Sequence, residues 1–135
     1  MTPASLPLQK AVYERLLADL ASFEELGGPP RIFDAPPAGA PFPYVVIGEA
    51  SVSKLPGHDA AAHDFRIEIF SRHAGRREVK LILDRVVEAL HDADFPVDGA
   101  RLVNCRFVFG DIFRPDGGET FRGLLRFRCV TESLT

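Results

Sequence analysis

Two segments near the C-terminal end alternate between apolar and polar residues, and they flank the turn-forming sequence RPDGGE. In the second segment, FRGLLRFRCV, the odd-numbered positions are mainly apolar and the even-numbered positions include three arginines. Because successive side chains of a strand point to opposite faces, this pattern predicts a strand with one apolar face and one arginine-bearing face. Two such runs around a glycine-containing turn predict a β-hairpin, so the chain must build an antiparallel sheet.

The alternation also predicts which residues of this hairpin lie opposite one another. With the turn centred near Gly117, apolar residues face apolar residues in four pairs: Cys105 with Cys129, Phe107 with Phe127, Phe109 with Leu125, and Phe113 with Phe121. The same register sets Arg106 opposite Arg128. Two like charges in direct opposition are unfavourable, so we expect an acidic partner from outside the hairpin.

The N-terminal half of the sequence predicts one helix followed by an irregular connecting segment. An apolar stripe at helical spacing, formed by Val12, Tyr13, Leu16, Leu17 and Leu20, predicts a helix that the sequence LGGPP ends near Leu26. Residues 27–43 hold six of the eleven prolines, which excludes a long helix or a central strand. We expect an ordered, irregular connecting segment there, with one short strand at residues 31–34.

The middle of the chain predicts two strands and a second helix. The runs YVVIGEASVS from Tyr44 and FRIEIFS at residues 65–71 read as strands, and KLPGHDAAAHD at residues 54–64 reads as an unusually long connecting loop. In GRREVKLILDRVVEALHDA, apolar residues recur three and four positions apart, which predicts an amphipathic helix: Val79, Ile82, Leu83, Val86, Val87 and Leu90.

These elements follow the order α-β-β-β-α-β-β and predict an α+β fold. The economical packing is one mostly antiparallel sheet of about four to five strands with two helices on one face, in a single domain spanning residues 1–135. The opposite face of the sheet then collects mostly charged residues: Arg66, Glu68, Arg106, Arg122, Arg126 and Arg128.

Composition narrows the classes of function. The net charge of −3 argues against a protein whose main task is to grip DNA, since such domains are usually basic. No run of about 18 apolar residues and no secretory signal is recognisable, so we expect no membrane association. Cys105 and Cys129 are too few for a disulfide scaffold, and we expect two buried, reduced thiols in a cytoplasmic protein.

The sequence offers little enzyme chemistry. It lacks the nucleophile-elbow, phosphate-loop, zinc-protease and dinucleotide-binding motifs, and its carboxylates are scattered. His58, Asp59, His63 and Asp64 are residue types that bind metals, but their spacing matches no closed site. We therefore expect no catalytic residues, no cofactor and no metal.

The arginine face has three interpretations. It could be a solvated face with salt bridges to Glu68 and Glu119, a nucleic-acid surface, or a subunit interface. The hairpin aromatics are expected to point inward, so a nucleic-acid surface would lack stacking groups. Arginine is enriched in interfaces, where it pairs with carboxylates of a neighbour. The opposition of Arg106 and Arg128 favours the subunit interface slightly over the solvated face.

Four segments, in this order and spacing, resemble one known family: LQKAVYERLLAD, GGPPRIFDAPPAGAPFPYVVIGEASVS, GRREVKLILDRVVEALHD and RLVNCRFVF…DGGETFRGLLRFRCVTE. The family is that of small phage-type tail completion proteins, which includes tail terminators of siphophages and gene transfer agents. The resemblance covers almost the whole chain, and FPYVVIGE and GLLRFR are its most specific parts. The composition looks most like the gene transfer agent members.

This resemblance implies a structural, non-enzymatic role without a cofactor. Such proteins form a hexameric ring on the head-proximal end of the tail tube, stop tube growth and dock the tail onto the head's stopper or connector, while DNA passes through the centre. The protein would assemble in the cytoplasm and then belong to the particle. Other joining proteins, tail-tube proteins and small nucleic-acid-binding domains are the alternatives.

A closed ring needs two different surface patches that fit each other. We expect them on the arginine face, on the loop from Ser51 to Asp64 and on the hairpin tip. The candidate interface residues are therefore Arg66, Glu68, Arg106, Arg122, Arg126, Arg128, Lys54, His58, Asp59, Asp116 and Gly117.

Overall fold

The computed structural model describes residues 2–134 and, within that range, every side chain except that of Asp116. The elements are α1 (Ser5–Asp19), a 3-10 turn η1 (Glu24–Leu26), β1 (Ile32–Phe33), β2 (Tyr44–Lys54), β3 (Ala60–Ser71), α2 (Arg77–Leu90), β4 (Ala100–Phe113), a 3-10 turn η2 (Pro115–Gly117) and β5 (Phe121–Ser133). This order of helices and strands confirms the predicted α+β fold.

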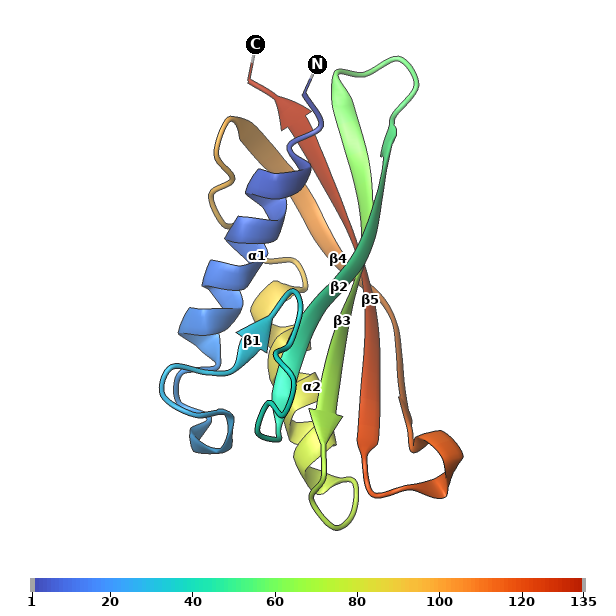
Figure 1. Ribbon diagram of the computed structural model, residues 1–135. Helices are drawn as coiled ribbons and strands as arrows, with labels where there is room; N and C mark the ends of the chain where they lie inside the picture. Colours follow the sequence, from blue (N-terminus) through green and yellow to red (C-terminus); the bar gives the residue numbers. More distant parts are fainter. Residues whose placement is uncertain (1, 135) are drawn as a thin grey trace.

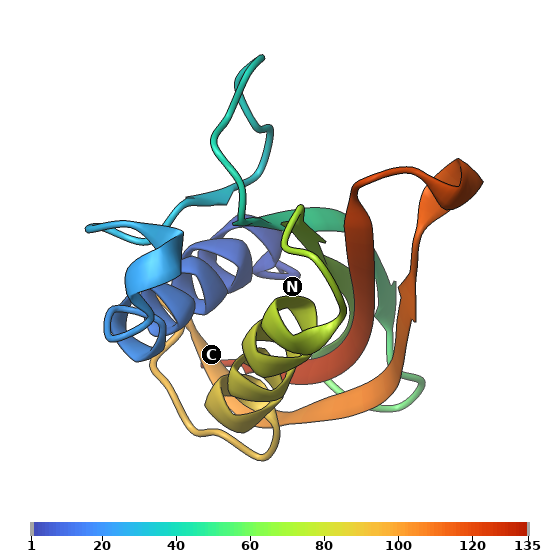
Figure 2. The same ribbon diagram turned by 90° about the horizontal axis from the view of Figure 1, so that it is seen from below.

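Within the described residues, five strands form one sheet in the order β1-β2-β3-β5-β4. Every pairing is antiparallel except that of β1 with β2. Both helices lie on the same face of this sheet (Figure 1), and the sheet curves around them in the view of Figure 2. We call the face that lies away from the helices the outer face. None of the helices described is both long and apolar enough to span a bilayer.

The core lies between the helices and the sheet. The predicted stripe of α2 is buried there, with Val79, Ile82, Val86 and Leu90 fully inaccessible. Gly123 on β5 lets this helix approach, because a Cβ at that position would lie 3.3 Å from Val79 Cγ2. A side chain at position 123 would therefore force Val79 to move by a few tenths of an ångström.

The first helix is shorter than predicted. It ends at Asp19, and the chain continues through a turn and η1 before Gly27. Leu16, Leu20 and Leu26 are all fully buried, so the apolar signal that extended the predicted helix comes partly from the turn that follows it. Tyr13, assigned to the buried stripe, is 38% exposed.

The hairpin of β4 and β5 has the predicted register only over its first half. Cys105 lies opposite Cys129, and Phe107 lies opposite Phe127. A β-bulge at Val108 then adds one residue to β4, so Phe109 lies opposite Arg126 instead of Leu125. The extra residue turns Phe109 to the outer face, where its side chain is 49% exposed.

Because of the same one-residue shift, the pairing near the hairpin tip also differs from the predicted pairing. Phe113 lies opposite Arg122, not opposite Phe121. Gly110 takes the place opposite Leu125, and a Cβ there would meet the Phe107 ring at 3.2 Å. The predicted row of aromatic residues facing one another is therefore wrong beyond Phe107.

The predicted loop at residues 54–64 is mostly strand. β2 continues to Lys54 and β3 begins at Ala60, which leaves only residues 55–59 as a turn. Ala61 and Ala62 pair with β2 on one side of β3 and with β5 on the other, Ala60 pairs with β5, and all three are buried. Backbone pairing on both sides overrides the weak strand preference of alanine.

Candidate functional site

The structure brings six of the predicted site residues together on the outer face. Arg66 and Glu68 lie on β3, Arg106 lies on β4, and β5 carries Arg122, Arg126 and Arg128. Arg106 is opposite Arg128, as predicted, and Arg66 is also directly opposite Arg126. Two like-charged cross-strand pairs therefore lie side by side on three adjacent strands.

The side chain of Arg122 has its partners inside the same chain. Its Nε donates to Glu68 Oε2 at 2.6 Å, and a guanidinium NH2 group also contacts this carboxylate. The guanidinium carbon lies 5.4 Å from the centre of the Phe70 ring and 5.8 Å from that of Phe113. Because the Glu68 side chain is only 15% exposed, this ion pair is part of the fold.

Arg106 finds its acidic partner inside the same chain. Its Nε lies 2.9 Å from Asp92 Oδ1, and both side chains are 60% exposed. Asp92 belongs to the connection between α2 and β4, so the expected acid does come from outside the hairpin but not from another molecule. At this exposure such a pair stabilises the fold by at most ~1 kcal/mol.

The side chains of three arginines form no ion pair or hydrogen bond with any described residue: Arg66, Arg126 and Arg128. All three are exposed. Glu119, predicted as a salt-bridge partner, forms no ion pair among the described residues either. We call these three residues the free arginines.

Two carboxylates lie near the free arginines without pairing. A shallow hollow of about 240 Å³ on the outer face is lined by Glu49, Asp64, Arg66 and Arg126. Asp64 is opposite Arg128 in the β3–β5 register. The outer face therefore has a basic centre on β5 and an acidic margin toward β2, and both are open to an external partner.

The other predicted site residues lie at opposite ends of the molecule. Lys54 ends β2, and His58 and Asp59 lie in the turn that follows. Gly117 lies in η2 at the tip of the β4–β5 hairpin, at the far end of the sheet (Figure 1). Asp116 shares that turn, and its side chain is outside the described part. The loop from Ser51 to Asp64, predicted as one patch, does not exist as such, because only its central five residues leave the sheet.

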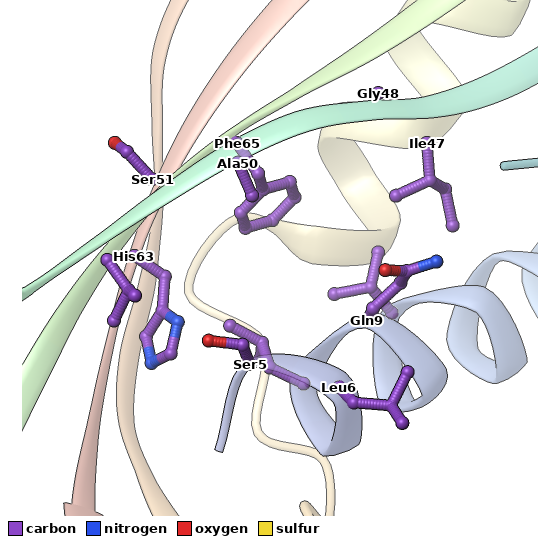
Figure 3. Close-up of a pocket in the computed structure, with 12 residues that line it drawn as sticks. Ser5, Leu6, Gln9, Ile47, Gly48, Ala50, Ser51, His63 and Phe65 are labelled. Carbon is purple, nitrogen blue, oxygen red and sulfur yellow. The ribbon is translucent and has the colours of Figure 1, made fainter. Parts of the chain in front are cut away.

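An apolar hollow that the sequence did not reveal lies between the start of α1 and strands β2 and β3 (Figure 3). It measures about 280 Å³ and is lined mainly by apolar side chains, including Leu6, Ala50, Val52 and Phe65. The alternation of residues 50–54 and 60–64 could have predicted it, but their alanines and serines are weak strand signals.

His63 borders this hollow as a buried structural residue. Its Nε2 lies 2.9 Å from Thr131 Oγ1, which in turn donates to the Pro3 carbonyl oxygen at 3.4 Å. Burial lowers the pKa of His63 below its ordinary value. The side chain therefore stays neutral and ties β3 and β5 to the N-terminal segment.

The remaining chemistry-bearing residues do not converge. Strand alternation turns His63 toward the core and Asp64 toward the outer face, so the side chains of this pair point to opposite faces of the sheet. Among the side chains that the structure describes, no three of His, Cys, Asp or Glu are grouped as a metal site would need.

Cys105 and Cys129 are buried thiols, as predicted. A hydrogen bond with the Cys105 thiol, reinforced by burial, raises the pKa of Cys129 well above its usual range. This thiol is therefore unsuited to act as a nucleophile.

Residues 10–132 match the family described as tail completion protein gp17. The chain belongs to this family. It is 28% identical to the tail completion protein gp17 of Bacillus phage SPP1 over 127 residues, which cover 93% of this chain and 92% of that protein. Membership of a tail completion family identifies the chain as a structural protein of a phage-like tail.

Two solved structures are similar to this tail completion protein. A chain in the virion of a native gene transfer agent particle is 28% identical, with a TM-score of 0.75 over 93% of this chain and 95% of that one. The structure of bacteriophage SPP1 gp17 is 21% identical, with a TM-score of 0.56 over 95% of this chain and 91% of that one, and it supports the fold. The expected resemblance to gene transfer agent members is confirmed.

Proposed function

We propose that this tail completion protein ends the tail tube at its head-proximal side and joins the tail to the stopper or connector of the head. Several copies, six by the family resemblance, would form a ring through which DNA passes. The observation that carries the proposal is the family match over nearly the whole chain, together with the similarity to a chain of the gene transfer agent virion. Assembly would take place in the cytoplasm before the protein becomes part of the particle.

The free arginines support a subunit or partner contact. Opposed like charges destabilise a sheet, and this chain keeps two such pairs on one face. Arg122 and Arg106 are neutralised internally, so Arg66, Arg126 and Arg128 are the residues that an acidic neighbour would compensate. We therefore assign the interface role chiefly to these three arginines.

The two ends of the molecule suit contacts with two different neighbours. A joining protein must touch the tube on one side and the head on the other. The β2–β3 turn with Lys54, His58 and Asp59 lies at one end, and the hairpin tip with Asp116 and Gly117 lies at the other (Figure 1). We propose that each end contacts one of these partners.

One observation favours a second candidate, contact with nucleic acid. The bulge at Val108 places Phe109 on the outer face opposite Arg126, and an exposed ring beside a cation is typical of single-strand binders. The net charge of −3 argues against it as a main function. A DNA affinity that falls steeply with salt would support this candidate, and weak binding at low salt would exclude it.

Electron microscopy of particles from cells lacking this gene tests the proposal. We expect DNA-filled heads without tails, next to unattached or overlong tubes, and rescue by the gene supplied in trans. A tail-tube protein would instead leave no tubes at all. Tailed particles with tubes of normal length would refute the proposed function.

A further inference from the structure

The sheet has two edges that no described residue completes. On the side of β2 away from β3, β1 pairs only with Val45 and Val46, so the seven residues 48–54 have no described strand on that side. β4 forms the opposite edge of the sheet. The connection after α2 covers the first half of this edge, where the Asp92 amide donates to the Cys105 carbonyl and the Phe107 amide donates to His91 Nδ1. The six residues 108–113 have no such cover among the described residues.

Both uncovered stretches present backbone groups that can pair. The Leu55 amide donates to the Ala60 carbonyl at 3.0 Å, so this opposed pair is hydrogen-bonded and alternate pairs along the hairpin are not. By this alternation the N–H and C=O groups of Val52 point away from β3. On β4, the backbone N–H and C=O groups of Phe107 point away from β5. After the bulge, the backbone groups of Gly110 and Ile112 have this same orientation.

Exposed apolar side chains border both stretches. Val108 and Phe109 on β4 are 56% and 49% exposed. Val52 on β2 is 42% exposed and Leu6 is 72% exposed, and both line the apolar hollow, where Figure 3 shows Leu6. Natural sheets protect open edges with charged residues, prolines, bulges or covering loops; the sequence VFGDIF has the bulge at Val108 and one charge, Asp111, but neither a lysine nor a proline. Such an edge points to a strand partner.

We propose that the free edge of β4 in one copy pairs with the free edge of β2 in the next copy, so that the sheet continues from subunit to subunit. β2 and β4 run in opposite directions within one chain, so a copy that continues the sheet sets them antiparallel. The two free stretches are nearly equal in length. Because they are different surfaces, the contact is heterologous and can close into a ring.

Charge is also complementary across this contact. The unpaired carboxylate of Glu49 lies on β2, and the free arginines Arg126 and Arg128 lie on β5, next to β4. Joining the two edges places Glu49 of one copy two strands away from β5 of the next.

The offset between the two edges predicts how the strands are inclined. Ser51 is level with Asp64, whereas Asp111 is level with Glu68 through Leu124, four residues farther along β3. Pairing Ser51 with Asp111 therefore shifts successive copies by ~13 Å over four strand spacings of ~4.8 Å. This corresponds to a tilt of roughly 35°, similar to that of strands in closed barrels, so the strands run obliquely to the ring axis.

This inference rests on the proposed function, and disulfide mapping in purified particles tests it. Ser51→Cys and Asp111→Cys place one thiol on each edge, both toward the outer face, and Ser53→Cys with Asp111→Cys samples the register one side-chain repeat away. Under mild oxidation at least one of these double variants is expected to give a ladder of covalent oligomers on a non-reducing gel. The single variants, and Ser51→Cys combined with Tyr13→Cys on α1, should stay monomeric.

The outcomes separate the two levels of the proposal. If the double variants are present in particles and neither gives a ladder, edge pairing is refuted while the tail role stands. If the wild-type chain is missing from the particles, the proposed function itself fails.

A backbone variant provides an independent check. Val52→Pro removes an outward N–H without touching the β2–β3 hydrogen bonds, whereas Val52→Ala keeps the N–H. We expect loss of tailed particles for the proline variant alone, with thermal unfolding confirming that both variants fold. Equal assembly by two folded variants would contradict the pairing of this edge.

Discussion

Reversing the charge of Arg126 should stabilise the isolated protein while weakening its assembly. Arg126 lies directly opposite Arg66 and forms no ion pair with any described residue. Cross-strand charge pairs change stability by roughly 0.2–1 kcal/mol in either direction. Arg126→Glu turns a repulsive pair into an attractive one, so we expect a gain of about 0.5–1 kcal/mol in the free energy of unfolding.

For a domain of this size, such a gain raises the melting temperature by roughly 2–4 °C. The shift should be measured by thermal denaturation in low salt and again in 1 M salt, where a screening length of ~3 Å suppresses the effect. Arg126→Gln removes the repulsion without adding attraction, so it should give about half the shift. Incorporation into particles, measured on the same variants, should fall for Arg126→Glu.

Arg77→Glu is the matched control for assembly, because Arg77 is an exposed arginine on α2, away from the outer face. It should be incorporated as the wild type is. A salt-independent loss of stability in Arg126→Glu would show that the opposed arginines do not repel each other. Normal incorporation of Arg126→Glu would show that the outer face is not an assembly surface.

Two further predictions concern the fold. Phe127 is fully buried, and the centres of the Phe65 and Phe107 rings lie 5.7 and 5.8 Å from the centre of its ring. Phe127→Ala should therefore lower the free energy of unfolding by about 3–5 kcal/mol, measured by urea denaturation. The control Phe109→Ala, at an exposed position, should lower it by less than ~1 kcal/mol. Similar losses for both would contradict the assignment of the core. His63 has a lowered pKa, so below pH 6.5 the unfolded state takes up a proton that the folded state does not. Stability should fall as the pH is lowered from 7.5 to 5, and His63→Gln should show a smaller fall; an identical fall would assign the effect to other groups.

In the β4–β5 hairpin, the periodicity of the sequence predicted the strand register correctly in one half and wrongly in the other. The alternation of apolar residues predicted that Cys105 faces Cys129 and Phe107 faces Phe127, because burial of one face specifies the register. The bulge at Val108 was not predicted, although the isolated Gly110 in the strand pattern is a weak signal for one. It lies in β4 of the curved sheet (Figure 2), and it reversed the orientation predicted for Phe109.

At residues 54–64 the prediction failed in a different way, because a segment predicted as a loop is mostly strand. Glycine, proline and alanine made this segment read as a loop, yet Ala61 and Ala62 are central strand residues because neighbouring strands pair with them on both sides. Local preference is weak where tertiary pairing supplies the hydrogen bonds. The hollow beside His63 and the free edge of β2 were missed for the same reason.

By itself, the sequence determined the second helix, the C-terminal hairpin and a sheet face crowded with arginines, since each follows from the period of a single segment. Only the tertiary structure decided which arginines are free. Glu68 reaches Arg122 from a neighbouring strand 54 positions away in the chain, and Asp92 reaches Arg106 from a connecting loop. Ion pairs and open sheet edges depend on which segments become neighbours in space, and no local pattern encodes that proximity.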